Sequence, residues 1–127
     1  MRKKILLIED DDEVRELMLI ALHEDGYEVA TAADGSHGYD TALFMKPDLI
    51  ITDINMPGAD GIHILRRMRE QRLLEHTPVL VTTAFGTGSA TFSLQHGASA
   101  FEPKPIDTQS LRSTVLRLLT DSSKLTN

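Results

Sequence analysis

The fold is decided by an apolar run at residues 5–8 and an acidic run at residues 9–13, Ile5-Leu6-Leu7-Ile8-Glu9-Asp10-Asp11-Asp12-Glu13. A short apolar run of this kind predicts a strand that is buried on both faces of a parallel sheet. The acids then lie where the strand leaves the sheet, at the edge where open α/β sheets bind ligands. A row of five acids is ordinarily a disordered, solvated segment. This row instead lies between a predicted strand and a predicted helix.

The composition bounds the class of protein. The chain has 127 residues, 41% hydrophobic and 25% charged, which is typical of one globular domain. Its net charge of −6 argues against direct nucleic acid binding, because such surfaces need clustered Lys and Arg. It has no Cys, so disulfides and thiolate metal sites are excluded. No apolar stretch has the length of a membrane span and no secretory signal is evident, so we expect a cytoplasmic protein without membrane contact.

Apolar runs alternate with helical patterns along the whole chain. After the first run, further strands are expected at residues 27–32, 49–52, 79–82 and 98–102. Five strands, each followed by a helix, imply a parallel sheet with helices on both faces. Right-handed crossovers favour a doubly wound, flavodoxin-like α/β fold with strand order 2-1-3-4-5. We expect residues 1–120 to form this domain and residues 121–127 to be a polar tail or the start of a linker.

Capping and breaking residues predict where the helices begin and end. Gly26 is typical of the end of the first helix. Ser36 is a candidate cap of the second helix, which must end near Lys46 because a proline follows. Asp107 is a candidate cap of the last helix. Residues 86–96 are rich in Gly, Ser and Thr, which predicts a short or mobile fourth helix.

Polar residues stand at the predicted C-terminal ends of the strands. Glu9 and Asp10 follow the first strand, Asp53 the third, Thr83 the fourth and Lys104 the fifth. Carboxylates gathered at one edge raise one another's pKa unless a cation holds them, and Mg²⁺ is the hard divalent cation of choice. With an ammonium and a hydroxyl nearby, this set suits a phosphoryl group. A carboxylate at its centre can itself be the nucleophile.

Neighbouring residues have simpler interpretations. Asp11 and Asp12 are expected to cap the first helix and compensate its dipole. Thr82 competes with Thr83 for the site, but alternation along the strand should point it the other way.

Four segments together resemble the receiver domains of two-component response regulators: residues 5–11, 47–61, 78–84 and 101–105. The resemblance covers about residues 3–119. It implies that Asp53 accepts a phosphoryl group from a phosphohistidine, on a sensor histidine kinase or a histidine phosphotransfer protein of a phosphorelay. Mg²⁺ would be held by Asp10, Asp53 and the backbone carbonyl of Asn55, while Glu9 would act through water.

The resemblance also implies how the switch works. Lys104 would pair with the phosphoryl oxygens and Thr83 would hydrogen-bond to them. In this family Thr83 moves toward the phosphoryl group, and the aromatic side chain at Phe101 turns inward to fill the space. The bond between Lys104 and Pro105 is expected to be cis.

Some positions depart from the family pattern. The segment from Thr83 to Gly97 is about one residue shorter than usual, and Ser99 and Ala100 replace a pair of acids found in many transcription-factor receivers. We therefore expect a monomer or weak dimer. Asn55 and Phe85 occupy positions that tune the lifetime of the phosphorylated state, and bulky Phe85 is predicted to slow hydrolysis.

Three functions compete. The first is a signalling switch that promotes its own phosphorylation and dephosphorylation and controls an unidentified output, rather than a turnover enzyme. The second is a Mg²⁺-dependent phosphatase with an aspartyl nucleophile, although such enzymes usually carry a second Asp where this chain has Asn55. The third is a phosphorylation-independent protein-binding module on the same fold.

Overall fold

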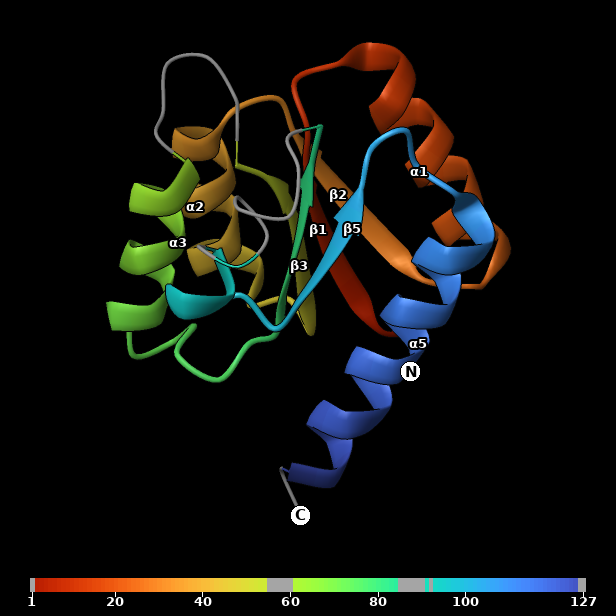
Figure 1. The fold of residues 1–127 in the computed structure, drawn as a ribbon. Helices are drawn as coiled ribbons and strands as arrows, with labels where there is room; N and C mark the ends of the chain where they lie inside the picture. Colours follow the sequence, from red (N-terminus) through yellow and green to blue (C-terminus); the bar gives the residue numbers. More distant parts are fainter. Residues whose placement is uncertain (1, 55–60, 85–90, 92, 126–127) are drawn as a thin grey trace.

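The computed structural model describes residues 2–54, 61–84, 91 and 93–125. Within these residues the strands are β1 (Lys4–Ile8), β2 (Glu28–Ala32), β3 (Leu49–Asp53), β4 (Val79–Thr83) and β5 (Ala100–Pro103). They form one parallel sheet in the order β2-β1-β3-β4-β5, and helices cover both of its faces (Figure 1). The predicted fold class and strand order are confirmed.

The helices form two layers on opposite faces of the sheet. They are α1 (Asp12–Glu24), α2 (Gly35–Met45), α3 (Gly61–Glu70) and α5 (Thr108–Leu125). α2 and α3 lie together on one face, and α1 and α5 lie on the other (Figure 1). Residues 91 and 93–95 are also helical and His96 lies in a turn, whereas residues 86–90 and 92 of the predicted fourth helix lie outside the described residues. No helix in the described part of the chain is long and apolar enough to cross a membrane.

Two hydrophobic clusters hold these layers to the sheet. The cluster under α2 and α3 contains Leu6, Ile8, Ile50, Val79 and Val81 from the strands. The cluster under α1 and α5 contains the alternate strand residues Ile5, Leu7, Leu49, Ile51 and Leu80. Because the inner strands are covered on both faces, both sets of alternating positions are apolar. This explains the continuous apolar runs in the sequence.

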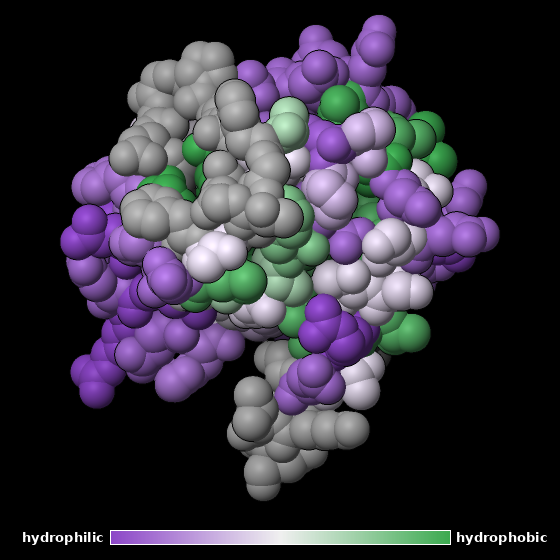
Figure 2. All heavy atoms as spheres, viewed as in Figure 1, coloured by the Kyte–Doolittle hydropathy of each residue, from purple (hydrophilic) through white to green (hydrophobic). Residues whose placement is uncertain are grey.

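The face of the molecule shown in Figure 2 is mostly hydrophilic where it is coloured. Figure 2 shows hydrophilic residues over the outer sides of the helices, with hydrophobic residues in small groups between them. The most exposed large apolar side chain among the described residues is Phe44 on α2. Singly scattered apolar residues are normal on a protein surface.

Carboxylate caps begin three of the helices. Asp11 Oδ1 accepts hydrogen bonds from the backbone N–H groups of Glu13 (2.9 Å) and Val14 (3.1 Å), which confirms its predicted role at α1. Asp107 Oδ1 does the same for the first turn of α5. The prediction for α2 was wrong, because Asp34 caps this helix and Ser36 lies inside its first turn.

Helix ends agree with the predictions at two sites, and the last helix extends to Leu125. Gly26 has a φ of 86°, the left-handed conformation that follows a helix end, just beyond α1. Lys46 ends α2 with a φ of 49°. α5 includes residues 121–125, the beginning of the polar segment. A helix satisfies its own backbone hydrogen bonds, so polar residues can extend it beyond its packed part.

Candidate functional site

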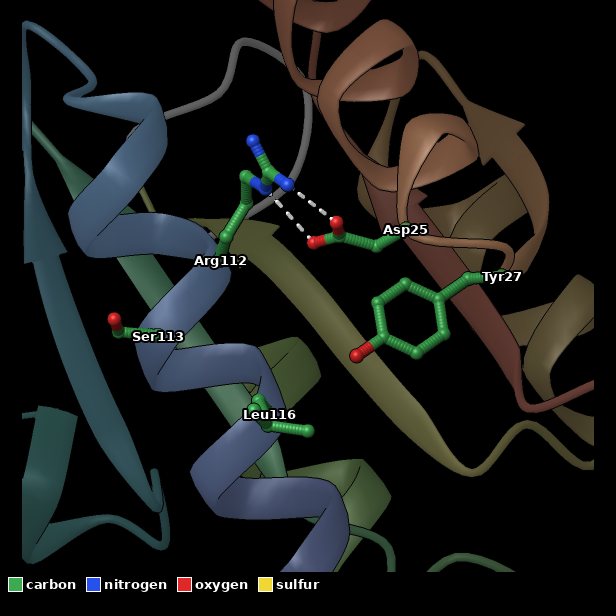
Figure 3. A pocket seen from close by; sticks show the side chains of 5 residues that line it. All are labelled: Asp25, Tyr27, Arg112, Ser113 and Leu116. Atoms are coloured by element: carbon green, nitrogen blue, oxygen red, sulfur yellow. Dashed lines mark hydrogen bonds and ion pairs between the residues drawn. The ribbon is translucent and has the colours of Figure 1, made fainter.

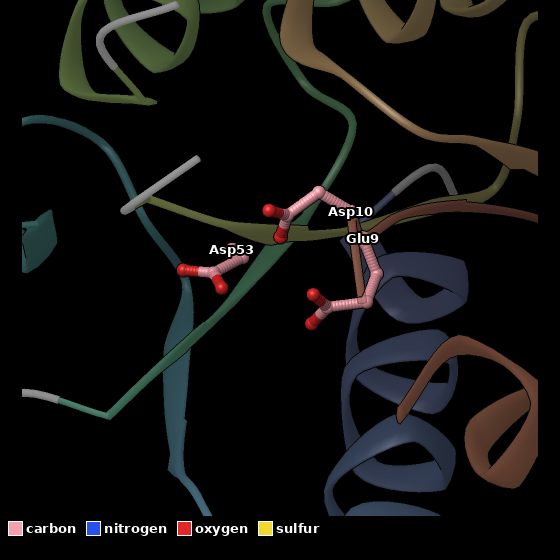
Figure 4. Close-up of side chains that lie close together, drawn as sticks. All are labelled: Glu9, Asp10 and Asp53. Atoms are coloured by element: carbon pink, nitrogen blue, oxygen red, sulfur yellow. The ribbon is translucent and has the colours of Figure 1, made fainter. Parts of the chain in front are cut away.

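Three carboxylates meet at the C-terminal edge of the sheet. In β1 and β3, Ile8 pairs with Thr52, so the next residues, Glu9 and Asp53, lie side by side. Oxygens of Glu9, Asp10 and Asp53 all lie within 4.8 Å of one another (Figure 4). Glu9 is fully buried and Asp53 is 5% exposed, whereas Asp10 is exposed to solvent. The cluster is therefore open on the side of Asp10.

Lys104 supplies a positive charge to this cluster. Its Nζ lies 2.6 Å from Glu9 Oε1 and 2.6 Å from Asp53 Oδ2. Its backbone N–H donates to the carbonyl of Thr83 at 2.9 Å, which fixes it beside the end of β4. The bond between Lys104 and Pro105 is cis, as predicted. Lys104 thus bridges two of the three acids.

Glu9 is held from several directions. Its backbone N–H donates to the carbonyl of Ala32 at 3.0 Å, and its carbonyl accepts from Arg15 at 2.8 Å. Its second carboxylate oxygen, Oε2, accepts from the backbone N–H of Asp11 at 3.1 Å. Both carboxylate oxygens therefore contact donors. Glu9 orients Lys104 directly in this structure, and its water-mediated contact to a metal remains a prediction.

Burial and the neighbouring charges shift the pKa of Glu9, and that of Lys104, in opposite directions. Burial raises the pKa of Glu9, and the hydrogen bonds from Lys104 and Asp11 only partly offset this. For Lys104, burial alone disfavours the charged form, but contacts with Asp53 and Glu9 outweigh it and hold the pKa above its ordinary value. Lys104 is consequently cationic at neutral pH.

The two threonines at the end of β4 lie on opposite faces. Leu80 packs under α1 and α5 and Val81 under α2 and α3, so alternation places Thr82 with Leu80 and Thr83 with Val81. Both threonines are buried. The backbone carbonyl of Thr83 accepts a hydrogen bond from the backbone N–H of Lys104, so the two residues are neighbours.

Other predicted site residues are placed in part. Phe101 is half-buried and packs against the cluster under α2 and α3. Asn55, whose backbone carbonyl is the predicted metal ligand, and Phe85 lie outside the described residues.

The sequence interpretation missed Glu102. This residue is 8% exposed on β5, and its Oε2 accepts a hydrogen bond from Thr114 Oγ1 of α5 at 3.3 Å. A signal was present, because Glu102 is two residues after Ala100 and therefore on the same covered face of the sheet. An acid at such a position needs a partner from another element.

A hollow away from the acidic cluster lies between the end of α1 and α5 (Figure 3). It is lined by Asp25, Tyr27, Arg112, Ser113 and Leu116. Arg112 donates to both carboxylate oxygens of Asp25, at 2.9 and 2.6 Å, and burial raises the pKa of Tyr27. The charged groups here already satisfy each other. The acidic edge remains the site with chemistry to assign.

A model of the response regulator receiver domain family matches residues 5–116. The chain belongs to this family. The receiver domain is 33% identical over 120 residues to the alkaline phosphatase synthesis transcriptional regulatory protein PhoP of Bacillus subtilis, covering 94% of this chain and 49% of that protein. It is also 33% identical over 120 residues to sporulation initiation phosphotransferase F of the same species, covering 94% of this chain and 95% of that protein.

Solved structures agree with this assignment. The chemotaxis response regulator CheY4 of Vibrio cholerae superposes with a TM-score of 0.87 at 30% identity, covering 93% of this chain and 99% of CheY4. The receiver domain spans about half the length of PhoP but nearly all of phosphotransferase F. Its relatives thus include both longer regulators and proteins of its own size.

Proposed function

We propose that this receiver domain takes a phosphoryl group onto Asp53 with Mg²⁺ and switches conformation to control an output. The donor is a phosphohistidine on a histidine kinase or a phosphotransfer protein. The observation that carries the proposal is the position of Asp53, which is nearly buried, lies within 4.8 Å of two other carboxylates and contacts Lys104 at 2.6 Å. Phosphorylation, the metal and the cytoplasmic location all belong to this proposal.

The transfer step needs a nucleophile and a leaving group. A carboxylate oxygen of Asp53 attacks the phosphorus atom, the bond from phosphorus to the histidine nitrogen breaks, and its electron pair returns to the imidazole. The product is an acyl phosphate on Asp53. The protein contributes position and charge, which is how phosphoryl transfer is mainly catalysed.

The acids suit a hard divalent cation. Their donors are all carboxylate oxygens, which is the ligand type that Mg²⁺ prefers. Asp10 and Asp53 would hold the ion together with the carbonyl of Asn55, and Glu9 would reach it through water. When bound, Mg²⁺ would neutralise charge on the phosphoryl oxygens. Solvent-exposed Asp10 provides the open side for ion and donor.

Lys104 and Thr83 act on the transferred group. The Lys104 ammonium already lies at Asp53, so it can pair with phosphoryl oxygens as they arrive. Thr83 would donate its hydroxyl to the same oxygens, and Phe101 would fill the space that Thr83 leaves. A phosphoryl group adds roughly −1.5 to −2 charges and three acceptors, which is enough to bias a two-state element.

The test is uptake of one phosphoryl group. The protein is incubated with Mg²⁺ and acetyl phosphate and its intact mass is measured, with Asp53→Asn as the test variant and exposed Asp40→Asn of α2 as the matched control. We expect one phosphoryl group on the wild type and on Asp40→Asn, and none on Asp53→Asn. Uptake by Asp53→Asn at the wild-type rate would falsify the assignment.

The same experiment distinguishes the proposed function from a phosphatase and from a phosphorylation-independent binding module. Repeated turnover of free phosphate esters would favour a phosphatase. Failure of the wild type to bind Mg²⁺ and to gain mass would favour a phosphorylation-independent binding module.

A further inference from the structure

A row of polar side chains crosses the sheet beside the acceptor. The strand register pairs Asp53 with Thr82, and Thr82 with Glu102. All three share the face covered by α1 and α5, because the residues two positions earlier pack in that cluster: Ile51, Leu80 and Ala100. Thr82 is therefore flanked by a carboxylate-bearing residue on each neighbouring strand.

The hydroxyl of Thr82 is buried and lacks a partner. Thr82 is 0% exposed, and its Oγ1 makes no hydrogen bond to any residue that the structure describes. Buried polar groups are nearly always hydrogen-bonded, and each exception needs an explanation. The Thr82 hydroxyl lies between two acidic residues and can therefore donate a new hydrogen bond if one of them moves toward it.

Glu102 is bound weakly on the other side of this hydroxyl. It is 8% exposed and makes no ion pair within the described ranges. Its hydrogen bond from Thr114 of α5 is 3.3 Å long, beyond the usual 2.5–3.0 Å of such bonds. A carboxylate held this loosely can exchange one hydroxyl donor for another.

We propose that Glu102 exchanges Thr114 of α5 for Thr82 of β4 when Asp53 is phosphorylated. Thr82 and Glu102 are then positioning residues that transmit the state of the acceptor to α5. This inference rests on the proposed function, because the phosphoryl group is what drives the exchange.

Lys104 connects the acceptor to this row. It lies two residues after Glu102, and its backbone is bonded to the end of β4 at Thr83. Negative charge on phosphorylated Asp53 draws the Lys104 ammonium from its contact with Glu9 toward the phosphoryl oxygens. That movement displaces the end of β5, and with it Glu102, relative to Thr82.

The exchange gives the buried Thr82 hydroxyl a partner and leaves Thr114 able to find another. Half-buried Thr114 can hydrogen-bond to water once Glu102 leaves it, whereas fully buried Thr82 cannot reach water. Release of Thr114 removes a polar contact that holds α5 to β5.

Hydrogen exchange of α5 amides, with and without phosphorylation by Mg²⁺ and acetyl phosphate, tests the proposal. We expect α5 near Thr114 to exchange faster in the phosphorylated wild type. Thr82→Val should take up the phosphoryl group normally but lose this difference, and Thr82→Ser should restore it. Thr31→Val, at an exposed position of β2, is the matched control and should behave as the wild type.

A second measurement uses the unphosphorylated protein. Thr82→Val should leave the urea midpoint of unfolding unchanged or higher, because it removes an unpaired hydroxyl, whereas Thr114→Val should lower it. An equal fall in both variants would show that Thr82 is already bonded at rest, which overturns the exchange.

The outcomes separate the two proposals. Normal uptake by Thr82→Val with an unchanged α5 response overturns the exchange and leaves the proposed function intact. Absence of uptake by the wild type overturns the proposed function, and the exchange with it.

Discussion

At the scale of single residues, the site is a balance between three acids and one ammonium. Mg²⁺ was predicted among the clustered carboxylates, with Lys104 as a further positive charge, and in this structure Lys104 contacts two of the carboxylates. It lies between Glu9 and Asp53, close to where a metal ion would act. A Mg²⁺ ion bound as proposed would therefore compensate the same charges as Lys104.

Lys104→Met should make stability depend on the metal. Without the ammonium, Glu9 is left buried and uncompensated, so we expect the free energy of unfolding to fall by about 1–3 kcal/mol in the absence of Mg²⁺. Added Mg²⁺ should recover more stability in this variant than in the wild type. Urea unfolding with Mg²⁺ or with EDTA measures both effects. An equal response to Mg²⁺ in both proteins would contradict the shared role.

His37 and Asp34 provide a pH-dependent contact at the start of α2. His37 Nδ1 lies 2.6 Å from Asp34 Oδ2, and donating to this carboxylate holds the pKa of His37 above its ordinary value. The contact therefore contributes its full stabilisation of the folded state below the ordinary His pKa of about 6.5. This stabilisation is lost as the pH rises through the higher pKa of His37 in the folded protein. In Asp34→Asn the cap remains but the charge is gone, so the pKa of His37 should fall. NMR titration of the imidazole measures it, and an unchanged titration would refute this cause.

At the scale of elements, a glycine lets α2 approach β1. A Cβ added to Gly38 would meet Ile8 Cδ1 and lie 2.7 Å from Ile8 Cγ1. Ile8 is fully buried and directly precedes Glu9. The spacing between this helix and strand therefore affects the first acid of the site.

Gly38→Ala should destabilise the protein despite its better helix propensity. Overpacking costs about 1–3 kcal/mol, whereas Ala gains at most about 1 kcal/mol over Gly in a helix. Adding Ile8→Val removes Cδ1, the nearest clashing atom, and should restore part of the loss. Thermal unfolding of both single variants and the double variant measures the coupling. Simple additivity would show that the two residues do not clash.

The elements were largely predictable because their signals are local. Continuous apolar runs predicted the strands, and Asp11 and Asp107 predicted two caps. The prediction of Ser36 as the cap of α2 was wrong because two capping residues lie close together. Capping propensity alone does not choose between Asp34 and Ser36. The partner of Glu102 was not predictable, because Thr114 reaches it only through the packing of α5 on the sheet.

At the scale of the whole molecule, chain topology assembles the site. Right-handed crossovers and parallel pairing bring residues 9, 53 and 104 to one edge, so the candidate site followed from the strand ends alone. The direct pairing of Lys104 with Glu9 did not follow. It depends on how far one side chain extends across the sheet.

Mg²⁺ should stabilise the whole domain by mass action. A ligand at 100 times its Kd adds about 2.7 kcal/mol to the free energy of unfolding. Asp10→Asn should abolish most of this gain while leaving the metal-free protein folded, because Asp10 is exposed. Thermal unfolding across a Mg²⁺ titration measures the gain, with Asp40→Asn as control. A full gain in Asp10→Asn would exclude Asp10 as a ligand.

The contact between Lys104 and Glu9 joins strands that are not neighbours. It runs from beyond β5 to beyond β1, and both β3 and β4 lie between them. The side chain acts as a tie across four of the five strands. If phosphorylation draws the ammonium to a new anion, as proposed above, this direct connection between β1 and β5 would be lost. Under the proposed function, one charge change at Asp53 would then act on β1 and on β5 together.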